Sequence, residues 1–365
     1  MKYVDEFRNS AIAKKLVHKI NRLSKTIKQD IALMEVCGTH TVAMFRHGIR
    51  NILPKKIRII SGPGCPVCVT SQQDVDKAIA IAGSKDTTIT TFGDMIKVPG
   101  TQSSLAQARA EGNDIRVVYS VLDALDIARK NPKRKVVHLA IGFETTVPTV
   151  AAALKRAKRL KYRNFFILCA HKIIPPALKV LLNSPRCKIN GLILPGHVST
   201  IIGARPYQFI ARKFKIPGVI AGFEAIDILQ AIVMLLEQIW MEKPRIDIQY
   251  TRCVHSEGNV TAQRMLTEVF KVSDVNWRGL GLIKKSGLAL RNKFTDFDVQ
   301  KQFSFKLPKI KKTPCRCGDV LQGIIVPVQC PLFRKSCTPS MPIGPCMVSS
   351  EGACAAYYRY HGGKK

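Results

Sequence analysis

The 365-residue chain has no long apolar run that is free of charged residues. Residues 1–23 mix charges of both signs and lack the apolar core and small-residue cleavage site of a signal peptide. The most apolar later stretch, residues 218–240, contains Glu224, Asp227 and Glu237, and three acids without partners would be costly inside a bilayer. We therefore expect a soluble, cytoplasmic protein with no membrane association.

Acidic residues are scarce. The 58 Lys and Arg outnumber the 25 Asp and Glu, which gives a formal net charge of +33 and raises the question of nucleic-acid binding. The basic residues lie in short scattered groups such as LKRAKRLKYR and LPKIKKT, not in one stripe with interleaved aromatic residues. This pattern favours a solvated, lysine-rich surface, and nucleic acid is not an expected partner.

Eight short apolar runs alternate with helix-like segments between residues 30 and 225, which predicts an α/β fold with parallel sheets covered on both faces. The predicted strands are 31–36, 57–61, 87–92, 115–120, 135–141, 164–170, 189–194 and 218–222. The polar stretch NPKRKVV divides them four and four. We therefore predict two similar α/β domains, at 30–130 and 131–250.

The remaining residues, 251–365, become rich in Cys, Pro and Gly and have too little apolar periodicity to form a core alone. A metal centre could tie such a segment down. We predict a third, cysteine-rich domain at 251–365, with residues 1–29 packed against it. The chain has 12 cysteines, and in a reducing compartment these favour metal binding or thiol chemistry over structural disulfides.

The four cysteines nearest the end are separated by 6, 8 and 7 residues and are Cys330, Cys337, Cys346 and Cys354. Structural zinc sites usually use paired spacings of two to four residues, whereas a looping, Pro- and Gly-rich chain can wrap a larger [4Fe–4S] cluster. The spacing differs from the ferredoxin pattern, so zinc remains an alternative. Cys315 and Cys317, in PCRCGD, remain as substitute ligands.

Two further thiol motifs follow predicted strands. GPGCPVC places Cys65 and Cys68 before a helix, where backbone N–H groups favour the thiolate form. Such a pair suits reversible disulfide chemistry. The alternatives are half of a metal site or two inert thiols.

EVCGTH places Cys37 at a strand end and His40 three residues later. This pair suits a transition metal such as iron or a base-activated nucleophile, and a buried free cysteine is the alternative.

Two polar loops complete the set of candidate site residues. GFETT contributes Glu144, and PGHVS contributes His197 and Ser199. Both loops follow predicted strands, and ligands bind parallel sheets at the carboxyl ends of their strands. These residues either cap helices or line the same cleft as Cys37.

The motifs EVCGTH, GPGCPVC, GFETT, PGHVS and CTPSMPIGPCMVSSEGACAAYYRY, in this order, resemble the HypD family of [NiFe]-hydrogenase maturation proteins. The resemblance implies two similar α/β domains and a third domain that carries a [4Fe–4S] cluster. It implies a complex with HypC, in which the two proteins form a redox-active scaffold for an iron that carries cyanide and carbon monoxide, the Fe(CN)2CO group. Cyanide would come from HypE, and the group would pass through HypC to the hydrogenase large subunit.

The resemblance also implies roles for individual residues. Cys37 resembles the iron ligand, paired with a cysteine of HypC, and His40 resembles its functional neighbour. Cys65 and Cys68 resemble a redox-active pair between the iron and the cluster, and Glu351 resembles a required acid. Two alternatives are an iron–sulfur thiol-disulfide or electron-transfer oxidoreductase with a diffusible substrate and a zinc-stabilised nucleic-acid-binding protein.

Overall fold

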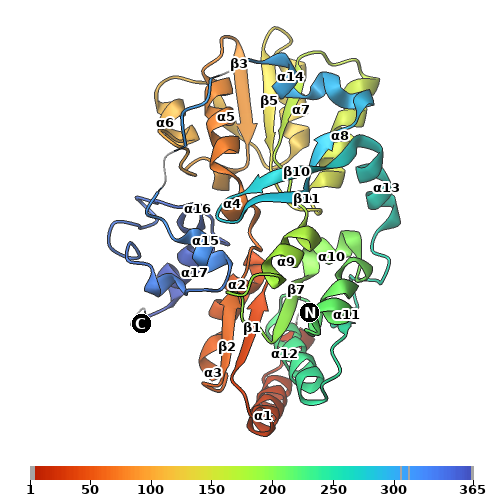
Figure 1. The fold of residues 1–365 in the computed structure, drawn as a ribbon. Helices are drawn as coiled ribbons and strands as arrows, with labels where there is room; N and C mark the ends of the chain where they lie inside the picture. The colour runs from red at the N-terminus through yellow and green to blue at the C-terminus, as the bar shows by residue number, and fades with distance from the viewer. Residues whose placement is uncertain (1–4, 305, 311–312, 363–365) are drawn as a thin grey trace.

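The computed structural model describes residues 5–304, 306–310 and 313–362 and contains two parallel sheets at opposite ends of the molecule (Figure 1). One sheet has five strands in the order β2-β1-β7-β8-β9, and the other has four in the order β4-β3-β5-β6. The strands are β1 Ile31–Glu35, β2 Ile57–Ser61, β3 Thr87–Thr91, β4 Ile115–Val117, β5 Lys135–Ala140, β6 Phe165–Cys169, β7 Gly191–Pro195, β8 Gly218–Ala221 and β9 Ile246–Ile248.

All eight predicted strands are present, so the α/β class with parallel sheets is confirmed. Helices connect the strands, and the strands of both sheets are largely buried on both faces. The helices are α1 Ser10–Thr26, α2 Gly38–Arg46, α3 Ile49–Ile52, α4 Pro66–Val69, α5 Gln72–Ala82, α6 Leu105–Ala110, α7 Val121–Lys130, α8 Val147–Arg159, α9 Ile174–Leu182, α10 Gly196–Ile202, α11 Gln208–Phe214, α12 Ala225–Trp240, α13 Val260–Val269, α14 Val299–Gln302, α15 Cys317–Leu321, α16 Pro345–Val348 and α17 Ala353–Tyr360.

The two sheets do not follow the predicted boundary at residue 130. The chain forms β1 and β2, builds all four strands of the other sheet, and then returns to add β7, β8 and β9 beside β1. The pairing of Met34 with Leu192 joins β1 directly to β7. Alternating apolar runs identify strands, but they do not specify which strands become neighbours, so the division into 30–130 and 131–250 is corrected.

The described residues of segment 1–29 pack mainly on the five-stranded half, whereas packing against the cysteine-rich region was expected. Helix α1 lies against α12, and its apolar side chains Ile20 and Leu23 join the core of the five-stranded half. An ion pair between Lys19 and Glu237, 2.5 Å apart, links the same two helices. The first four residues of this segment lie outside the described residues.

The predicted third domain divides into two parts. Helix α13 packs on α8, and an antiparallel hairpin of β10 Phe270–Trp277 and β11 Gly281–Leu290 joins the four-stranded half. The sequence did not predict this hairpin, because polar residues interrupt its apolar alternation. The short helices α15, α16 and α17 form a separate cysteine-rich unit beside the two halves (Figure 1). Residues 363–365 of the predicted domain are not described.

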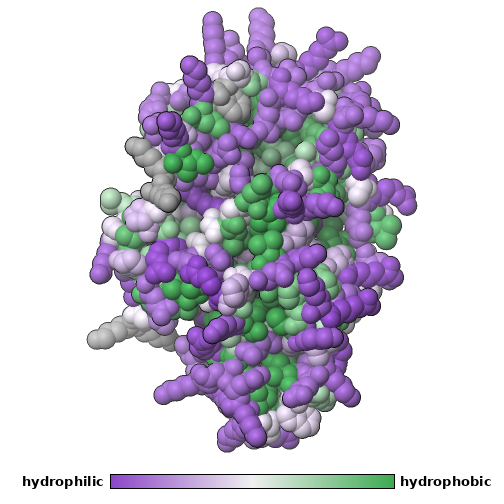
Figure 2. Space-filling model, in the orientation of Figure 1, coloured by the Kyte–Doolittle hydropathy of each residue, from purple (hydrophilic) through white to green (hydrophobic). Residues whose placement is uncertain are grey.

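Hydrophilic side chains cover much of the visible face and are interrupted by apolar residues along its middle (Figure 2). Among the helices that the structure describes, none has both the length and the apolar character needed to cross a membrane.

Candidate cysteine-rich site

The loop that follows β1 presents Cys37 at the start of helix α2. Cys37 is buried and is the N-cap residue of α2, and its backbone N–H donates to Glu35 Oε2 over 3.2 Å. The other oxygen of Glu35 accepts from the Thr41 hydroxyl. Because both oxygens bind within this one turn, the Glu35 carboxyl group holds the backbone that carries Cys37. Glu35 is not among the site residues predicted from the sequence. Its place at the end of an apolar strand, directly before Val36 and Cys37, is the signal that could have identified it as a buried carboxyl group.

The loop that carries the CxxC motif packs directly on the Cys37 loop. Gly64 accepts a hydrogen bond from the Gly38 N–H over 3.0 Å. A Cβ atom at residue 64 would lie only 2.1 Å from the Cys37 nitrogen, so a side chain cannot be accommodated there without a shift of the backbone. The close approach of the two loops therefore depends on glycine.

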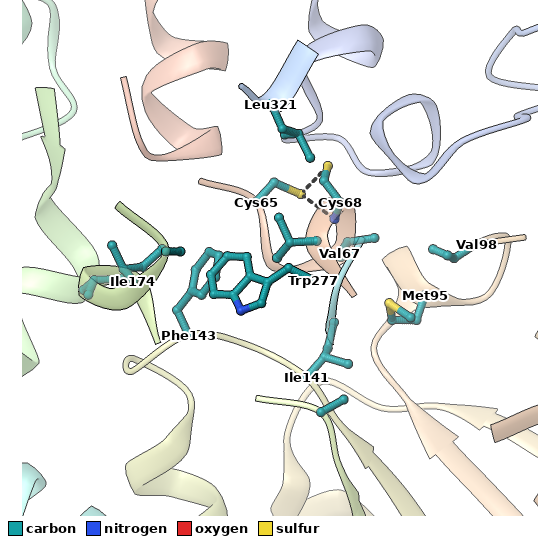
Figure 3. Packing of buried hydrophobic residues seen from close by; sticks show 14 of the residues in the cluster. Cys65, Val67, Cys68, Met95, Val98, Ile141, Phe143, Ile174, Trp277 and Leu321 are labelled. Atoms are coloured by element: carbon teal, nitrogen blue, oxygen red, sulfur yellow. Dashed lines mark hydrogen bonds between the residues drawn. The ribbon is translucent and has the colours of Figure 1, made fainter. Parts of the chain in front are cut away.

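The two cysteines of the CxxC motif face each other at the start of α4. Cys65 is the N-cap residue, its Sγ lies 2.8 Å from Cys68 Sγ, and it accepts the Cys68 backbone N–H over 3.3 Å. Figure 3 shows the pair between Trp277 of β10 and Leu321 of α15. The two sulfur atoms are therefore in contact, as a pair that closes to a disulfide would require.

Burial works against the thiolate that the helix N-terminus was expected to favour. It raises the pKa of Cys68 well above its usual value, although a hydrogen bond with Cys346 acts in the opposite direction. Helix α4 has only four residues, so its dipole is small compared with the cost of charging a fully buried sulfur. Unless a metal or another cation is close, Cys68 is a neutral thiol at neutral pH.

His40 is fully buried on α2, close to Cys37. Its Nε2–H donates to the Gly222 carbonyl oxygen over 2.9 Å, and Nδ1 has no partner in the structure. Burial lowers the pKa of His40 to about 4, so the imidazole is neutral at neutral pH. Its Nδ1 lone pair is thus free to accept a hydrogen bond.

The two predicted polar loops differ in how they approach this site. The rings of His40 and His197 both stack on Phe223, with centroids 4.8 Å and 4.0 Å away. The PGHVS loop therefore joins the Cys37 site through His197. Glu144 of the GFETT loop is buried: one oxygen accepts the Ile174 N–H over 3.1 Å, and the other has no partner among the described residues. Burial raises the pKa of Glu144 to about 7.

Glu351 brings the cysteine-rich unit to the Cys37 loop. Its Oε1 accepts the Thr39 hydroxyl over 2.6 Å, and a Cβ atom at Gly38 would lie 2.5 Å from the Glu351 Cβ. Burial, reinforced by the nearby Glu351 carboxylate, raises the pKa of Cys37 to about 12. The thiol must therefore lose its proton before it can act as a ligand. A metal ion that binds the sulfur displaces this proton, which passes to a base or to water.

The four cysteines predicted as cluster ligands line one cavity. They are Cys330, Cys337, Cys346 and Cys354, and Cys315 and Cys317 line the same cavity. The Cys346 thiol is hydrogen-bonded to Cys354 and to Cys68, so sulfur atoms connect the cavity with the CxxC pair. In the part of the chain that the structure describes, no three His, Cys, Asp or Glu side chains form a group suited to one metal ion.

A sequence profile of HypD, described as "Hydrogenase formation hypA family", matches residues 11–361. The chain belongs to the HypD family of hydrogenase maturation factors. It is 44% identical over 369 residues to "Hydrogenase maturation factor HypD2" of Bradyrhizobium diazoefficiens, which covers 99% of this chain and 97% of that protein. It is also 44% identical over 366 residues to the Escherichia coli "Hydrogenase maturation factor HypD", which covers 99% of this chain and 98% of that protein.

The match extends to an archaeal protein. The chain is 45% identical over 353 residues to a "Putative hydrogenase expression/formation protein" of Methanocaldococcus jannaschii, with coverage of 96% of this chain and 97% of that protein. The HypD assignment therefore rests on the whole chain and not on the cysteine motifs alone.

Proposed function

We propose that this chain is the scaffold on which, together with HypC, the Fe(CN)2CO group of [NiFe]-hydrogenase is assembled. The observation that carries the proposal is the packing of three motifs around one buried thiol: Cys37 lies beside neutral His40, against the CxxC loop, and next to Glu351. HypE would donate cyanide, and HypC would carry the group to the hydrogenase large subunit. We place this activity in the cytoplasm.

Cys37 is suited to bind the iron that is being loaded. A thiolate donates electron density, and cyanide and carbon monoxide need an electron-rich iron. The pKa of about 12 means that the Cys37 proton leaves only when a cation replaces it, so the empty site stays unreactive. The unpartnered Nδ1 of His40 offers a hydrogen-bond acceptor beside this step, but with a pKa of about 4 the imidazole does not retain the proton that Cys37 releases. Burial of both groups excludes water from the iron.

The thiols that line the cavity of the cysteine-rich unit support the proposal of a [4Fe–4S] cluster. Thiols distributed around a space match the four corners of a cube better than the single tetrahedral centre of zinc. Cys330, Cys337, Cys346 and Cys354 would hold the cluster, which when bound supplies one-electron redox chemistry. This chain's own residues place Cys346 against Cys68.

The CxxC pair gives the scaffold a second redox group. When Cys65 and Cys68 close to a disulfide, they release two electrons and two protons, and the 2.8 Å separation of their sulfur atoms needs little movement. Cys68 contacts Cys346 on one side, and the CxxC loop contacts the Cys37 loop on the other. The pair therefore lies on a route between the cavity and the iron-binding thiol.

The proposal is tested by anaerobic purification of the chain with HypC and HypE, followed by iron analysis and infrared spectroscopy. We expect about four irons in a brown protein, with additional bands of iron-bound cyanide and carbon monoxide. Cys337→Ala should remove the brown colour, Cys37→Ala should remove only the cyanide and carbonyl bands, and the exposed control Cys253→Ala should change neither. Full bands in Cys37→Ala, or a colourless wild-type protein with one zinc, would contradict the proposal.

A thiol-disulfide or electron-transfer oxidoreductase is the second candidate, because the sulfur atoms of Cys65 and Cys68 are in contact. Such an enzyme would turn over a small disulfide or electron acceptor without HypC or HypE. Absence of that turnover in a protein that still assembles the iron group would exclude it.

A further inference from the structure

Arg278 lies in the turn between β10 and β11. This turn contacts both the CxxC helix α4 and helix α15 of the cysteine-rich unit. Its backbone N–H donates to the Val69 carbonyl oxygen over 2.9 Å, directly after Cys68. The neighbouring Gly279 packs on α15, where its added Cβ would lie 2.5 Å from the Gly318 Cα. The Arg278 side chain therefore starts at a fixed position between the CxxC helix and the helix that begins at Cys317.

One nitrogen of the Arg278 guanidinium is buried without an acceptor. Nη2 donates to the Pro99 carbonyl oxygen over 2.9 Å, whereas Nη1 has no hydrogen-bond partner among the described residues. A buried cationic donor without an acceptor costs free energy, and an anionic group nearby removes that cost. A negative charge close to Nη1 would therefore stabilise the buried guanidinium.

One thiol of the cavity, that of Cys315, is close enough to Arg278 for its pKa to be affected by this charge. A hydrogen bond with Cys317, together with burial, raises the pKa of Cys315 far above its usual value, and Arg278 acts in the opposite direction. Cys315 also lies against the segment of Cys346, since a Cβ atom at Gly344 would lie 2.3 Å from Cys315 Sγ. Arg278 is therefore a cation close to the wall of the cavity that Cys346 and Cys315 share.

We propose that Arg278 is a positioning residue whose fixed positive charge raises the reduction potential of the metal cluster in the cysteine-lined cavity. The inference rests on the proposed function, because it requires a [4Fe–4S] cluster there. Four thiolates and an oxidised cluster carry a net charge of about −2, and reduction adds one more negative charge. A nearby cation stabilises the reduced form more than the oxidised form, in a region where burial weakens solvent screening.

The test is an anaerobic redox titration of the full chain, monitored by electron paramagnetic resonance, with iron content measured in parallel. At one fixed ambient potential, R278Q should lower the ratio of reduced to oxidised cluster about tenfold, a midpoint shift of about 59 mV to more negative values. R278K retains the charge and should stay within about twofold of wild type. The matched control is R316Q: Arg316 lines the same cavity, but Asp319 already neutralises it across 2.8 Å, so no shift is expected.

Each outcome decides between the two proposals. A wild-type chain without a cluster overturns the proposed function and this inference with it. R278Q with full iron content and an unchanged midpoint overturns the inference alone and leaves Arg278 as a tether of the turn. If R278Q loses the cluster, R278K decides: a cluster at the wild-type potential supports the role of the charge, and loss of the cluster in R278K as well overturns it.

Discussion

The two thiol regions of the molecule are built in different ways. Cys37 and the CxxC pair lie on turns between regular elements of the five-stranded half, and backbone hydrogen bonds such as Gly38 N–H to Gly64 O fix their positions. The cysteine-rich unit has only three short helices, and its own core is small. That core consists of Phe333, Cys337, Met347 and Tyr357. The first region is preformed by the fold, and we expect the second to depend on the cluster proposed for its thiols.

The largest effect should follow removal of the metal from the cysteine-rich unit. In Cys337→Ala, or after anaerobic chelation, we expect amide hydrogens of 313–362 to exchange about a thousandfold faster, a loss of about 4 kcal/mol, because metal binding supplies the folding free energy there. Amides of β1 and β7 should keep their protection. Hydrogen exchange with mass spectrometry measures both regions in one sample. If residues 313–362 were equally protected with and without metal, the cysteine-rich unit would be as independent of a metal as the Cys37 region is.

The preformed region should depend on Gly64 instead. Gly64→Ala places a Cβ 2.1 Å from the Cys37 nitrogen and should cost about 3 kcal/mol, because backbone atoms must move apart. The matched control is Gly83→Ala, where the new Cβ would lie at an ordinary contact distance of 3.7 Å from Ala80 O. Urea unfolding gives both free energies. If Gly64→Ala were as stable as Gly83→Ala, the two loops would not be in close contact.

The four-stranded half should be sensitive to acid, because it buries neutral histidines. Burial lowers the pKa of His138 to about 4, and burial together with His138 and Lys172 lowers the pKa of His171 to about 3. Both values lie below the unfolded value of about 6.5, so their contribution is complete above pH 6.5 and is lost as pH falls toward 4. At pH 5 each histidine should cost about 2 kcal/mol of unfolding free energy.

The measurement is the unfolding free energy at pH 7.5 and pH 5 for wild type, His138→Gln and a control at the exposed His255. His138→Gln should lose about 2 kcal/mol less than wild type between the two pH values, whereas His255→Gln should lose as much as wild type. The same loss in all three proteins would mean that His138 does not remain neutral in the folded state.

The sequence predicted the strands but not their partners. The predicted strand 57–61 matches β2 residue for residue, because its β-branched residues Ile57, Ile59 and Ile60 are buried in the sheet. The pairing of β1 with β7 depends instead on contacts between segments far apart in the chain. The boundary at residue 130 failed for this reason, since it assumed that consecutive strands stay in one sheet.

The candidate site shows the same division. Spacing in the sequence identified the cysteines and His40, because thiol and imidazole groups are metal ligands and nucleophiles wherever the fold places them. The roles of Glu35 and Arg278 come from the partners that their atoms find or lack, and those partners come from other elements. The pKa of Cys68 illustrates the point: a helix N-terminus suggested a thiolate, but burial, which no local pattern reveals, has the larger effect.

The smallest expected effect concerns the point where the two thiol regions meet. Glu351 belongs to the cysteine-rich unit, yet its carboxylate raises the pKa of Cys37 in the preformed region. Glu351→Gln keeps an acceptor for the Thr39 hydroxyl but removes the charge, so the thiolate fraction of Cys37 should rise about threefold, equivalent to about half a pKa unit. The rate of alkylation of Cys37 at pH 9, read by peptide mass spectrometry, measures this change, with Glu257→Gln on the surface as the control. An alkylation rate that does not change in Glu351→Gln would mean that the two regions touch without influencing each other's chemistry.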